Sequence, residues 1–305
     1  MAKAKIHTLL YYQFVEIKDP EKYAEKHKKM CEKLGLLGKV LVSEEGINGS
    51  VAGTKEKTDA YKREMRKDKR FRDMQFKEDV GIMMPFTKLA VRRKKEIIRM
   101  DQKLDMSKRG KYVTPKEFLD MYKRGEEMIV LDTRNSYESE VGKFKGAVTP
   151  NIETFREFAK VADEMKDKKN KKIVMYCTGG IRCEKASAYM IKKGFKDVSQ
   201  LHGGIVTFCK EFPNTVGEGK CFVFDKRLLV DEKGQNSENG CIYCSKKCDL
   251  YRNCKNVNCD AIFTVCQDCE HEMNACCSEE CLQEFREGCM VKAKRLQGKR
   301  IKLSA

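Results

Sequence analysis

The cysteine at position 177 lies in the segment of this chain that is best suited to chemistry. Four apolar residues, 173–176, run into Cys177, and a short loop with Gly179 and Gly180 leads to Arg182 and a helical pattern. This order predicts a strand, a thiol, a loop of main-chain N–H groups and a helix N-terminus, which together lower the pKa of a thiol. We therefore expect Cys177 to be a reactive thiolate rather than a structural cysteine.

The residues that follow Cys177 indicate which anion the loop would hold. The N–H groups of residues 178–182, beginning with Thr178, can converge on the sulfur, and Arg182 adds a permanent cation. Four residues separate Cys177 from Arg182. Phosphatases with a similar cysteine loop have one more, so this spacing favours sulfur over phosphate chemistry. Cys183 is either a resolving thiol for Cys177 or a packing residue at the start of the helix.

A second chemical pattern is the cysteine-rich end of the chain. Eleven of the sixteen cysteines lie between residues 241 and 289, a density that indicates metal rather than disulfides. Eight of them form four close pairs, which is enough for two tetrahedral sites of four thiolates. These eight predicted ligands are Cys241, Cys244, Cys254, Cys259, Cys266, Cys269, Cys277 and Cys281.

The order of these pairs suggests how they share the metal. Interleaved spacing favours a cross-brace, in which the first and third pairs bind one ion and the second and fourth bind the other, although sequential pairing also fits. We expect two structural zinc ions, because zinc favours thiolates and a small segment with few large apolar side chains needs metal to fold. An iron–sulfur cluster is the alternative. Cys276 could replace Cys277, and the spare candidates are Cys248, His271 and Cys289.

Alternating strands and helices are expected to position Cys177. The expected strands cover residues 127–132, 172–176 and 198–201. One expected helix starts at Thr114, and two others cover residues 155–166 and 184–193. This alternation is typical of a doubly wound parallel sheet, in which ligands bind beyond the carboxyl ends of the strands. Cys177 falls at such an end. Asp132 and Arg134 fall at another, where we expect them to brace the loop rather than to react.

The first hundred residues predict a separate unit with the order β-α-β-β-α-β, a ferredoxin-like α+β plait. Its expected strands cover 9–15, 38–43, 47–52, 75–82 and 89–98, and its expected helices cover 20–35 and 54–70. The whole chain is therefore expected to be an α/β multidomain protein. Its expected parts are a basic plait at residues 1–105, a doubly wound domain at 110–215, a zinc-binding segment at 220–290 and a basic tail at 291–305.

The positive charge of the chain is concentrated at its two ends. Of the formal net charge of +17, residues 1–110 carry +11 and residues 291–305 carry +6, so the middle is neutral. Solvated lysine faces are one explanation, and a polyanionic partner, RNA or DNA, is the other. No apolar run approaches the ~20 residues of a membrane-spanning helix and no signal sequence is evident, so we expect a cytoplasmic protein without a membrane partner.

Several motifs resemble a known family of sulfur-handling domains. The loop Cys177-Thr-Gly-Gly-Ile-Arg182 is similar to the active loop of rhodanese domains, in which a cysteine carries a persulfide. The segment Asp132-Thr-Arg134-Asn-Ser-Tyr-Glu138 resembles the rhodanese signature Asp-x-Arg-x-x-x-Glu, and residues 144–150 resemble the short segment that follows it. The resemblance implies a rhodanese fold for the central domain. A fold of this kind says little about function by itself.

A longer string, residues 177–187, is similar to the rhodanese-type tRNA uridine hydroxylases, which form 5-hydroxyuridine at the wobble position with molecular oxygen. Further segments that resemble this family are residues 44–49, 85–92, 95–97 and 221–225. The resemblance covers nearly the whole chain, including a cysteine-rich end that some members carry. It implies an enzyme that hydroxylates uridine 34, with Cys177, Arg182 and Cys183 as catalytic residues, oxygen as a substrate and the tRNA anticodon loop as partner.

The residues themselves leave other functions open. Neither a dinucleotide-binding glycine motif nor a facial metal triad is visible, so hydroxylation rests on the resemblance, while the loop favours sulfur chemistry. The alternatives are a sulfurtransferase that carries a persulfide on Cys177, and a zinc adaptor that binds RNA or protein. Candidate RNA contacts are Asn48, Arg92, Arg93, Lys292, Lys294 and Arg295. Candidate stacking residues, which could equally belong to the core, are Tyr11, Tyr12, Phe14 and Phe86.

Overall fold

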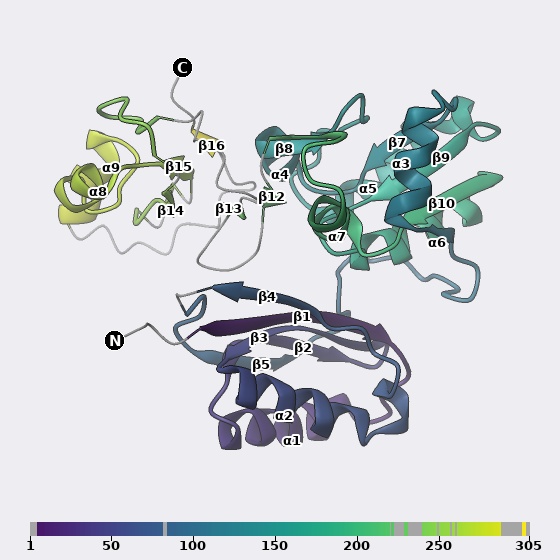
Figure 1. The fold of residues 1–305 in the computed structure, drawn as a ribbon, viewed down its shortest axis with the longest axis horizontal. Helices are drawn as coiled ribbons and strands as arrows, with labels where there is room; N and C mark the ends of the chain where they lie inside the picture. Colours follow the sequence, from purple (N-terminus) through teal and green to yellow (C-terminus); the bar gives the residue numbers. More distant parts are fainter. Residues whose placement is uncertain are drawn as a thin grey trace. The chain divides into compact units, whose positions relative to one another are not determined.

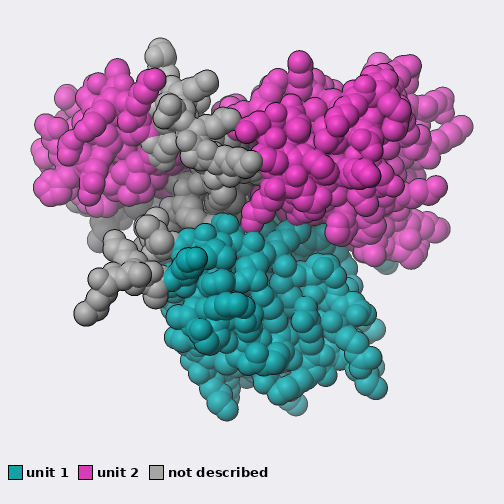
Figure 2. Space-filling view, in the orientation of Figure 1, with its two compact units in different colours: residues 1–103 teal, residues 104–305 magenta. Residues whose placement is uncertain are grey.

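The computed structural model describes most of the chain in two compact units, residues 1–103 and 104–305. Figure 1 draws the fold as a ribbon, and Figure 2 colours the two units separately. Each unit is described by itself below. The described residues are 5–81, 84–219, 221–222, 229–230, 240–248, 250–256, 258–259, 261–287 and 301–302.

Unit 1 forms the expected plait, with a five-stranded sheet in the order β4-β1-β3-β2-β5. All neighbouring strands run antiparallel except β2 and β5, which are parallel. Both helices lie on one side of the sheet (Figure 1). Its elements are β1 (Ile6–Phe14), α1 (Pro20–Lys33), β2 (Leu37–Ser43), β3 (Gly46–Gly53), α2 (Lys55–Arg66), β4 (Lys77–Gly81) and β5 (Leu89–Arg93).

Several boundaries in unit 1 differ from the sequence-based prediction, and two of them, the ends of α2 and β5, differ most. Helix α2 ends at Arg66 rather than at residue 70, because Asp68 starts a separate 3₁₀ turn by accepting a hydrogen bond from the Arg70 N–H over 3.0 Å. Strand β5 ends at Arg93 rather than at residue 98, since only residues 89–93 pair with β2. The start of α1 follows the sequence signals, with Asp19 as the N-cap and proline at the first helical position.

Unit 2 contains the expected doubly wound domain, a parallel sheet in the order β6-β10-β9-β7. Successive β9 residues are buried on both faces of this sheet, and helix α3 contacts α7 while α5 contacts α6. Its elements are β6 (Lys111–Val113), α3 (Pro115–Lys123), β7 (Ile129–Asp132), α4 (Ser136–Val141), β8 (Gly142–Phe144), α5 (Phe158–Glu164), β9 (Lys172–Tyr176), α6 (Ile181–Lys192), β10 (Asp197–Leu201), α7 (Gly204–Glu211) and β11 (Gly217–Gly219).

Four helices of this domain differ from the prediction. The helix expected at 155–166 is a short α5 between two 3₁₀ turns, and neither α4 nor α7 was predicted. Helix α6 begins at Ile181 rather than at residue 184. The earlier start follows from Gly180, which takes the left-handed φ of 101° that lets the chain turn directly into the helix. Arg182 and Cys183 therefore lie on the first turn of α6.

The cysteine-rich region has little regular structure and a core built largely of sulfur. Cysteines outnumber apolar side chains in its buried cluster, which agrees with the expectation that metal is needed for folding. Its described elements are β12 (Cys221–Phe222), β13 (Leu229–Val230), β14 (Tyr251–Asn253), β15 (Ile262–Thr264), α8 (Gln267–Glu272), α9 (Glu279–Arg286) and β16 (Ile301–Lys302). Among the residues described, no helix is both long and apolar enough to cross a membrane.

Candidate active site

Cys177 lies at the carboxyl end of the inner strand β9, fully buried, where the sequence predicts it. The Gly180 N–H donates a hydrogen bond to its sulfur over 3.0 Å. On the other side, the Ile205 N–H at the start of α7 donates to the Cys177 carbonyl over 2.9 Å. A Cβ at Gly204 would lie only 2.5 Å from that carbonyl oxygen, so the glycine lets α7 close directly on the loop.

The surroundings of Cys177 favour its thiolate. Burial alone raises the pKa of Cys177, but a hydrogen bond from the Cys183 thiol, the Arg182 guanidinium and nearby main-chain N–H groups outweigh burial and lower the pKa to about 5. Burial and the neighbouring Cys177 raise the pKa of Cys183 well above its usual value, so this thiol keeps its proton. The Thr133 hydroxyl lies 3.5 Å from the Cys183 sulfur. The pair is thus a thiolate with an adjacent thiol.

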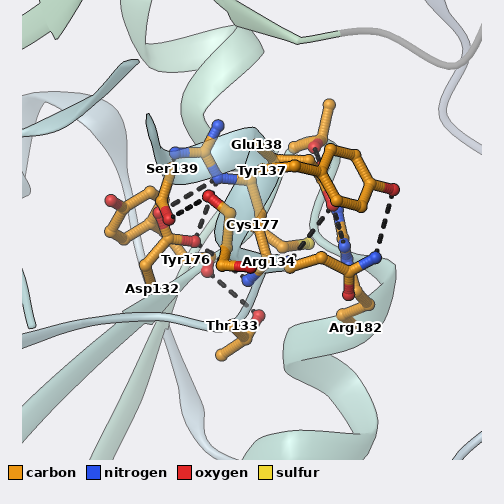
Figure 3. A network of polar contacts seen from close by, with 12 residues as sticks. Asp132, Thr133, Arg134, Tyr137, Glu138, Ser139, Tyr176, Cys177 and Arg182 are labelled. Carbon is orange, nitrogen blue, oxygen red and sulfur yellow. Dashed lines mark hydrogen bonds and ion pairs between the residues drawn. The ribbon is translucent and has the colours of Figure 1, made fainter. Parts of the chain in front are cut away.

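A buried ion pair fixes Arg182 beside the loop, as Figure 3 shows. The two guanidinium nitrogens of Arg182 donate to the two carboxylate oxygens of Glu138 over 2.6 and 2.7 Å. The Thr178 hydroxyl donates to the same carboxylate over 2.9 Å and accepts from Arg182 over 3.0 Å. Burial alone raises the pKa of Glu138, but Arg182 outweighs it and holds that pKa below its usual value. The cation is therefore held in one orientation.

Asp132 and Arg134 form a second buried ion pair, and both side chains are wholly inaccessible to solvent. Arg134 donates to Asp132 through Nε over 3.0 Å and through Nη2 over 2.7 Å, and it also donates to the Gly142 carbonyl. The guanidinium lies 5.4 Å from the centre of the Tyr176 ring, next to the cysteine in sequence (Figure 3). The ion pair joins the end of β7 to the Gly142 carbonyl and to Tyr176, and bracing of the loop stays a prediction.

The structure also shows contacts of Glu138, Glu184 and His202 that the sequence did not indicate. Glu138 was recognised as part of a signature, but only the fold shows that it binds Arg182 from the first turn of α4. Glu184, which follows Cys183, is buried and accepts a hydrogen bond from the Tyr112 hydroxyl over 2.6 Å. His202 is exposed and its ring packs edge-on against Tyr112. The sequence signal that could have pointed to Glu184 is its position directly after Cys183.

The eight predicted metal ligands lie in two groups of four, and the interleaved pairing is the one observed. The two sets are Cys241, Cys244, Cys266 and Cys269, and Cys254, Cys259, Cys277 and Cys281. In each set the sulfur atoms all lie within 4.8 Å of one another. Three measured separations are 3.7 Å for Cys244–Cys266, 3.4 Å for Cys259–Cys277 and 3.8 Å for Cys277–Cys281. A tetrahedral site with zinc–sulfur bonds of about 2.3 Å requires about 3.8 Å, so the donor sets fit zinc.

Comparison with known proteins identifies the family. A protein named tRNA uridine(34) hydroxylase from Bacillus licheniformis is 44% identical over 288 residues, covering 92% of this chain and 89% of the relative. Proteins of the same name from Staphylococcus carnosus and Cytophaga hutchinsonii are 44% and 43% identical, covering 91% and 90% of this chain and 90% and 88% of those relatives. The chain belongs to the tRNA uridine(34) hydroxylase family.

Three family models match three successive parts of this member of the hydroxylase family. The model described as UPF0176 acylphosphatase like domain matches residues 6–97, which is nearly all of unit 1. The rhodanese-like domain matches residues 114–211, from the N-cap of α3 to the end of α7. The model described as Rhodanase C-terminal matches residues 218–282 and contains all eight clustered cysteines. The predicted rhodanese fold of the central domain is thereby confirmed.

The candidate RNA contacts have differing surroundings. Arg92 and Arg93 are exposed on β5. The Asn48 amide instead donates to the Ile97 carbonyl over 3.0 Å, which gives it a structural contact. Tyr11, a candidate for stacking, is 1% exposed and belongs to the core of unit 1. The candidates Lys292, Lys294 and Arg295 lie outside the described residues.

Proposed function

We propose that this chain hydroxylates uridine 34 of tRNA at C5 and consumes molecular oxygen in doing so. The observation that carries the proposal is a complete thiolate site at Cys177 in a chain that matches named tRNA uridine(34) hydroxylases over about nine-tenths of its length. The same matches favour hydroxylation over the sulfurtransferase alternative, since the relatives are named for the tRNA reaction.

In this proposal the Cys177 sulfur is the reacting group, as a thiolate or as a persulfide. The Gly180 N–H and the Arg182 cation stabilise the negative charge, while Glu138 and Thr178 orient Arg182. The thiol of Cys183 lies against Cys177 and acts as the resolving group. Attack of Cys183 on the inner sulfur of a Cys177 persulfide would form a disulfide and release the outer sulfur as hydrosulfide, which balances atoms and electrons.

We further propose that each cysteine cluster binds one structural zinc ion. The four-thiolate donor sets and their spacing support zinc, and the cysteine-rich core needs cross-linking that its few apolar side chains do not supply. Elemental analysis of the purified protein should give two zinc ions per chain and a colourless solution. Cys254→Ser should reduce this content to one, whereas Cys276→Ser, outside both clusters, should leave it at two. Iron with visible absorption would contradict the proposal.

The remaining parts of the chain are assigned roles in binding the substrate. We propose a basic plait at residues 1–105, a rhodanese domain at 110–215, a zinc-binding segment at 220–290 and a basic tail at 291–305. The excess of cations at both ends supports binding of the tRNA phosphates, and the unpaired anticodon loop supports access of the base to Cys177. A tRNA substrate also supports a cytoplasmic location.

The test is nucleoside mass spectrometry of tRNA from cells with and without the protein. Cells that produce the wild-type chain should contain 5-hydroxyuridine, and Cys177→Ser should abolish it. Cys209→Ser is the matched control, because Cys209 is a half-buried cysteine of α7 outside both the loop and the metal clusters. A normal 5-hydroxyuridine level with Cys177→Ser would overturn the proposal, and thiosulfate turnover with unchanged tRNA would favour a sulfurtransferase.

A further inference from the structure

A short basic segment at the start of unit 2, residues 108–112, lies exposed along the edge of the sheet. Lys108, Arg109, Lys111 and Tyr112 are exposed, and 47% of Tyr112 is accessible to solvent. Tyr112 is one of four large apolar side chains that are exposed among the described residues. Three cations in the same short segment as an accessible ring provide both charge and a stacking face.

The segment is held in place by buried contacts to α6 and β10. The Gly110 N–H donates to the Ser187 hydroxyl over 3.0 Å, and the Gln200 amide donates to the Gly110 carbonyl over 2.9 Å. A Cβ at Gly110 would lie 2.9 Å from both the Ser187 Cβ and the Val198 carbonyl oxygen. The close fit anchors the segment, so its exposed side chains start from a fixed backbone.

A buried carboxylate then orients the two side chains that could contact a ligand. The side chain of Glu184 is 2% exposed, and its Oε2 lies 3.1 Å from a guanidinium nitrogen of Arg109. Its Oε1 accepts the Tyr112 hydroxyl over 2.6 Å. Burial and this hydrogen bond raise the pKa of Tyr112, so the phenol stays protonated as the donor. Glu184 thus presents a cation and an aromatic ring together.

His202 extends this surface toward the catalytic loop. Its ring lies edge-on to Tyr112, with 5.6 Å between ring centres and an angle of 84°. The parallel register pairs Gln200 with Met175, so His202 and Cys177, each two residues further on, directly follow the ends of neighbouring strands. Directly after His202, Gly203 and Gly204 lead into the α7 turn that packs on the Cys177 carbonyl. The surface therefore borders the active loop.

We propose that Arg109, Tyr112 and His202 bind a nucleotide that flanks the target uridine, with its base stacked on Tyr112 and its phosphate contacted by Arg109. This proposal rests on the proposed function, which identifies the RNA as tRNA, and it adds the site that binds the flanking nucleotide. Single-stranded RNA fits this surface because bases stack on exposed aromatic rings and phosphates pair with adjacent cations. A guanidinium group has five N–H donors, so Arg109 can pair with Glu184 through one side and donate to a phosphate through the other.

The test is the affinity of the full chain for an anticodon stem-loop RNA with U34, measured by fluorescence anisotropy without turnover. Tyr112→Ala should weaken binding by about 5- to 150-fold, the range for loss of one stacked base. Tyr112→Phe keeps the ring and should stay within about 3-fold of the wild type by the same stacking argument. Arg109→Ala should weaken binding and reduce the slope of log affinity against log salt by about 1.

Two further variants keep the result interpretable. Arg124→Ala removes another exposed arginine paired with a glutamate, at the C-cap of α3, and should bind like the wild type. His202→Ala removes an exposed ring but keeps the hydrogen bond from the residue 202 N–H to the Val113 carbonyl. The variant should therefore fold, and it should bind the RNA more weakly than the wild type. Wild-type affinity with both Tyr112→Ala and His202→Ala would overturn the proposal.

The kinetics separate this proposal from the proposed function. In the hydroxylation assay, Tyr112→Ala and His202→Ala should raise KM several-fold more than they lower kcat, because they bind the substrate and do not touch the reacting atoms. A wild-type chain that binds the RNA but forms no 5-hydroxyuridine would overturn the proposed function alone. A wild-type chain that hydroxylates, with unchanged KM in both variants, would overturn the nucleotide site alone.

Discussion

Replacement of Cys183 by alanine tests how the loop activates Cys177. Among the groups that lower the pKa of Cys177, the Cys183 thiol acts most strongly, against the larger effect of burial. A hydrogen bond to a charged group is worth about 1.5–3 kcal/mol, and about 1.36 kcal/mol corresponds to one pKa unit. Loss of one such hydrogen bond in Cys183→Ala should therefore raise the pKa of Cys177 by about 1 to 2.

The assay is the pH dependence of Cys177 alkylation by iodoacetamide, followed by mass spectrometry of the peptide that contains it. Since the thiolate is the nucleophile, the wild-type rate should rise with pH through about 5 and level off near neutrality, and the Cys183→Ala curve should lie at higher pH. Cys183→Ser keeps a donor and should resemble the wild type, as should Cys209→Ala. A wild-type midpoint near 9, or no change with Cys183→Ala, would refute the reasoning.

Further predictions concern the supports of the loop and the metal clusters. Glu138→Gln leaves Arg182 buried without its carboxylate, so it should lower the free energy of unfolding by about 3–5 kcal/mol in denaturant titration; a loss below about 1 kcal/mol would contradict the buried ion pair. Gly204→Ala places a Cβ 2.5 Å from the Cys177 carbonyl and should abolish hydroxylation, whereas Gly125→Ala, at a similar positive φ but in open space, should retain it. A zinc chelator should increase proteolysis of the cysteine-rich region first, and unchanged cleavage would argue against a structural metal.

Local sequence signals predicted the elements that carry Cys177 well. The apolar run before Cys177 gave β9 at the observed residues, 172–176. Thr114 forms the expected capping box, with the Glu117 N–H bonded to its hydroxyl and its own N–H bonded to the Glu117 carboxylate. Such features depend on neighbours a few residues apart, so the sequence alone carries them.

Contacts between distant segments were harder to predict. Glu138 and Arg182 are 44 residues apart in sequence, and only the packing of α4 against the loop brings them together. The resemblance to rhodaneses indicated that Glu138 belongs to the site but not which group it binds. The metal ligands were the exception, because regular cysteine spacing restricts which tetrahedral groupings are feasible. The eight cysteines were therefore predictable without the fold, whereas the spacing only favoured the interleaved pairing over the sequential one and the fold decided between them.

The central claim, that Cys177 supports oxygen-dependent hydroxylation of uridine 34, is tested most directly with purified protein. Unmodified tRNA with U34 is incubated with the chain, a thiol reductant and isotopically heavy oxygen gas, and the nucleosides are analysed by mass spectrometry. We predict 5-hydroxyuridine carrying one heavy oxygen atom with the wild-type chain and none with Cys177→Ser. Product carrying oxygen from water, or equal product from Cys177→Ser, would contradict it.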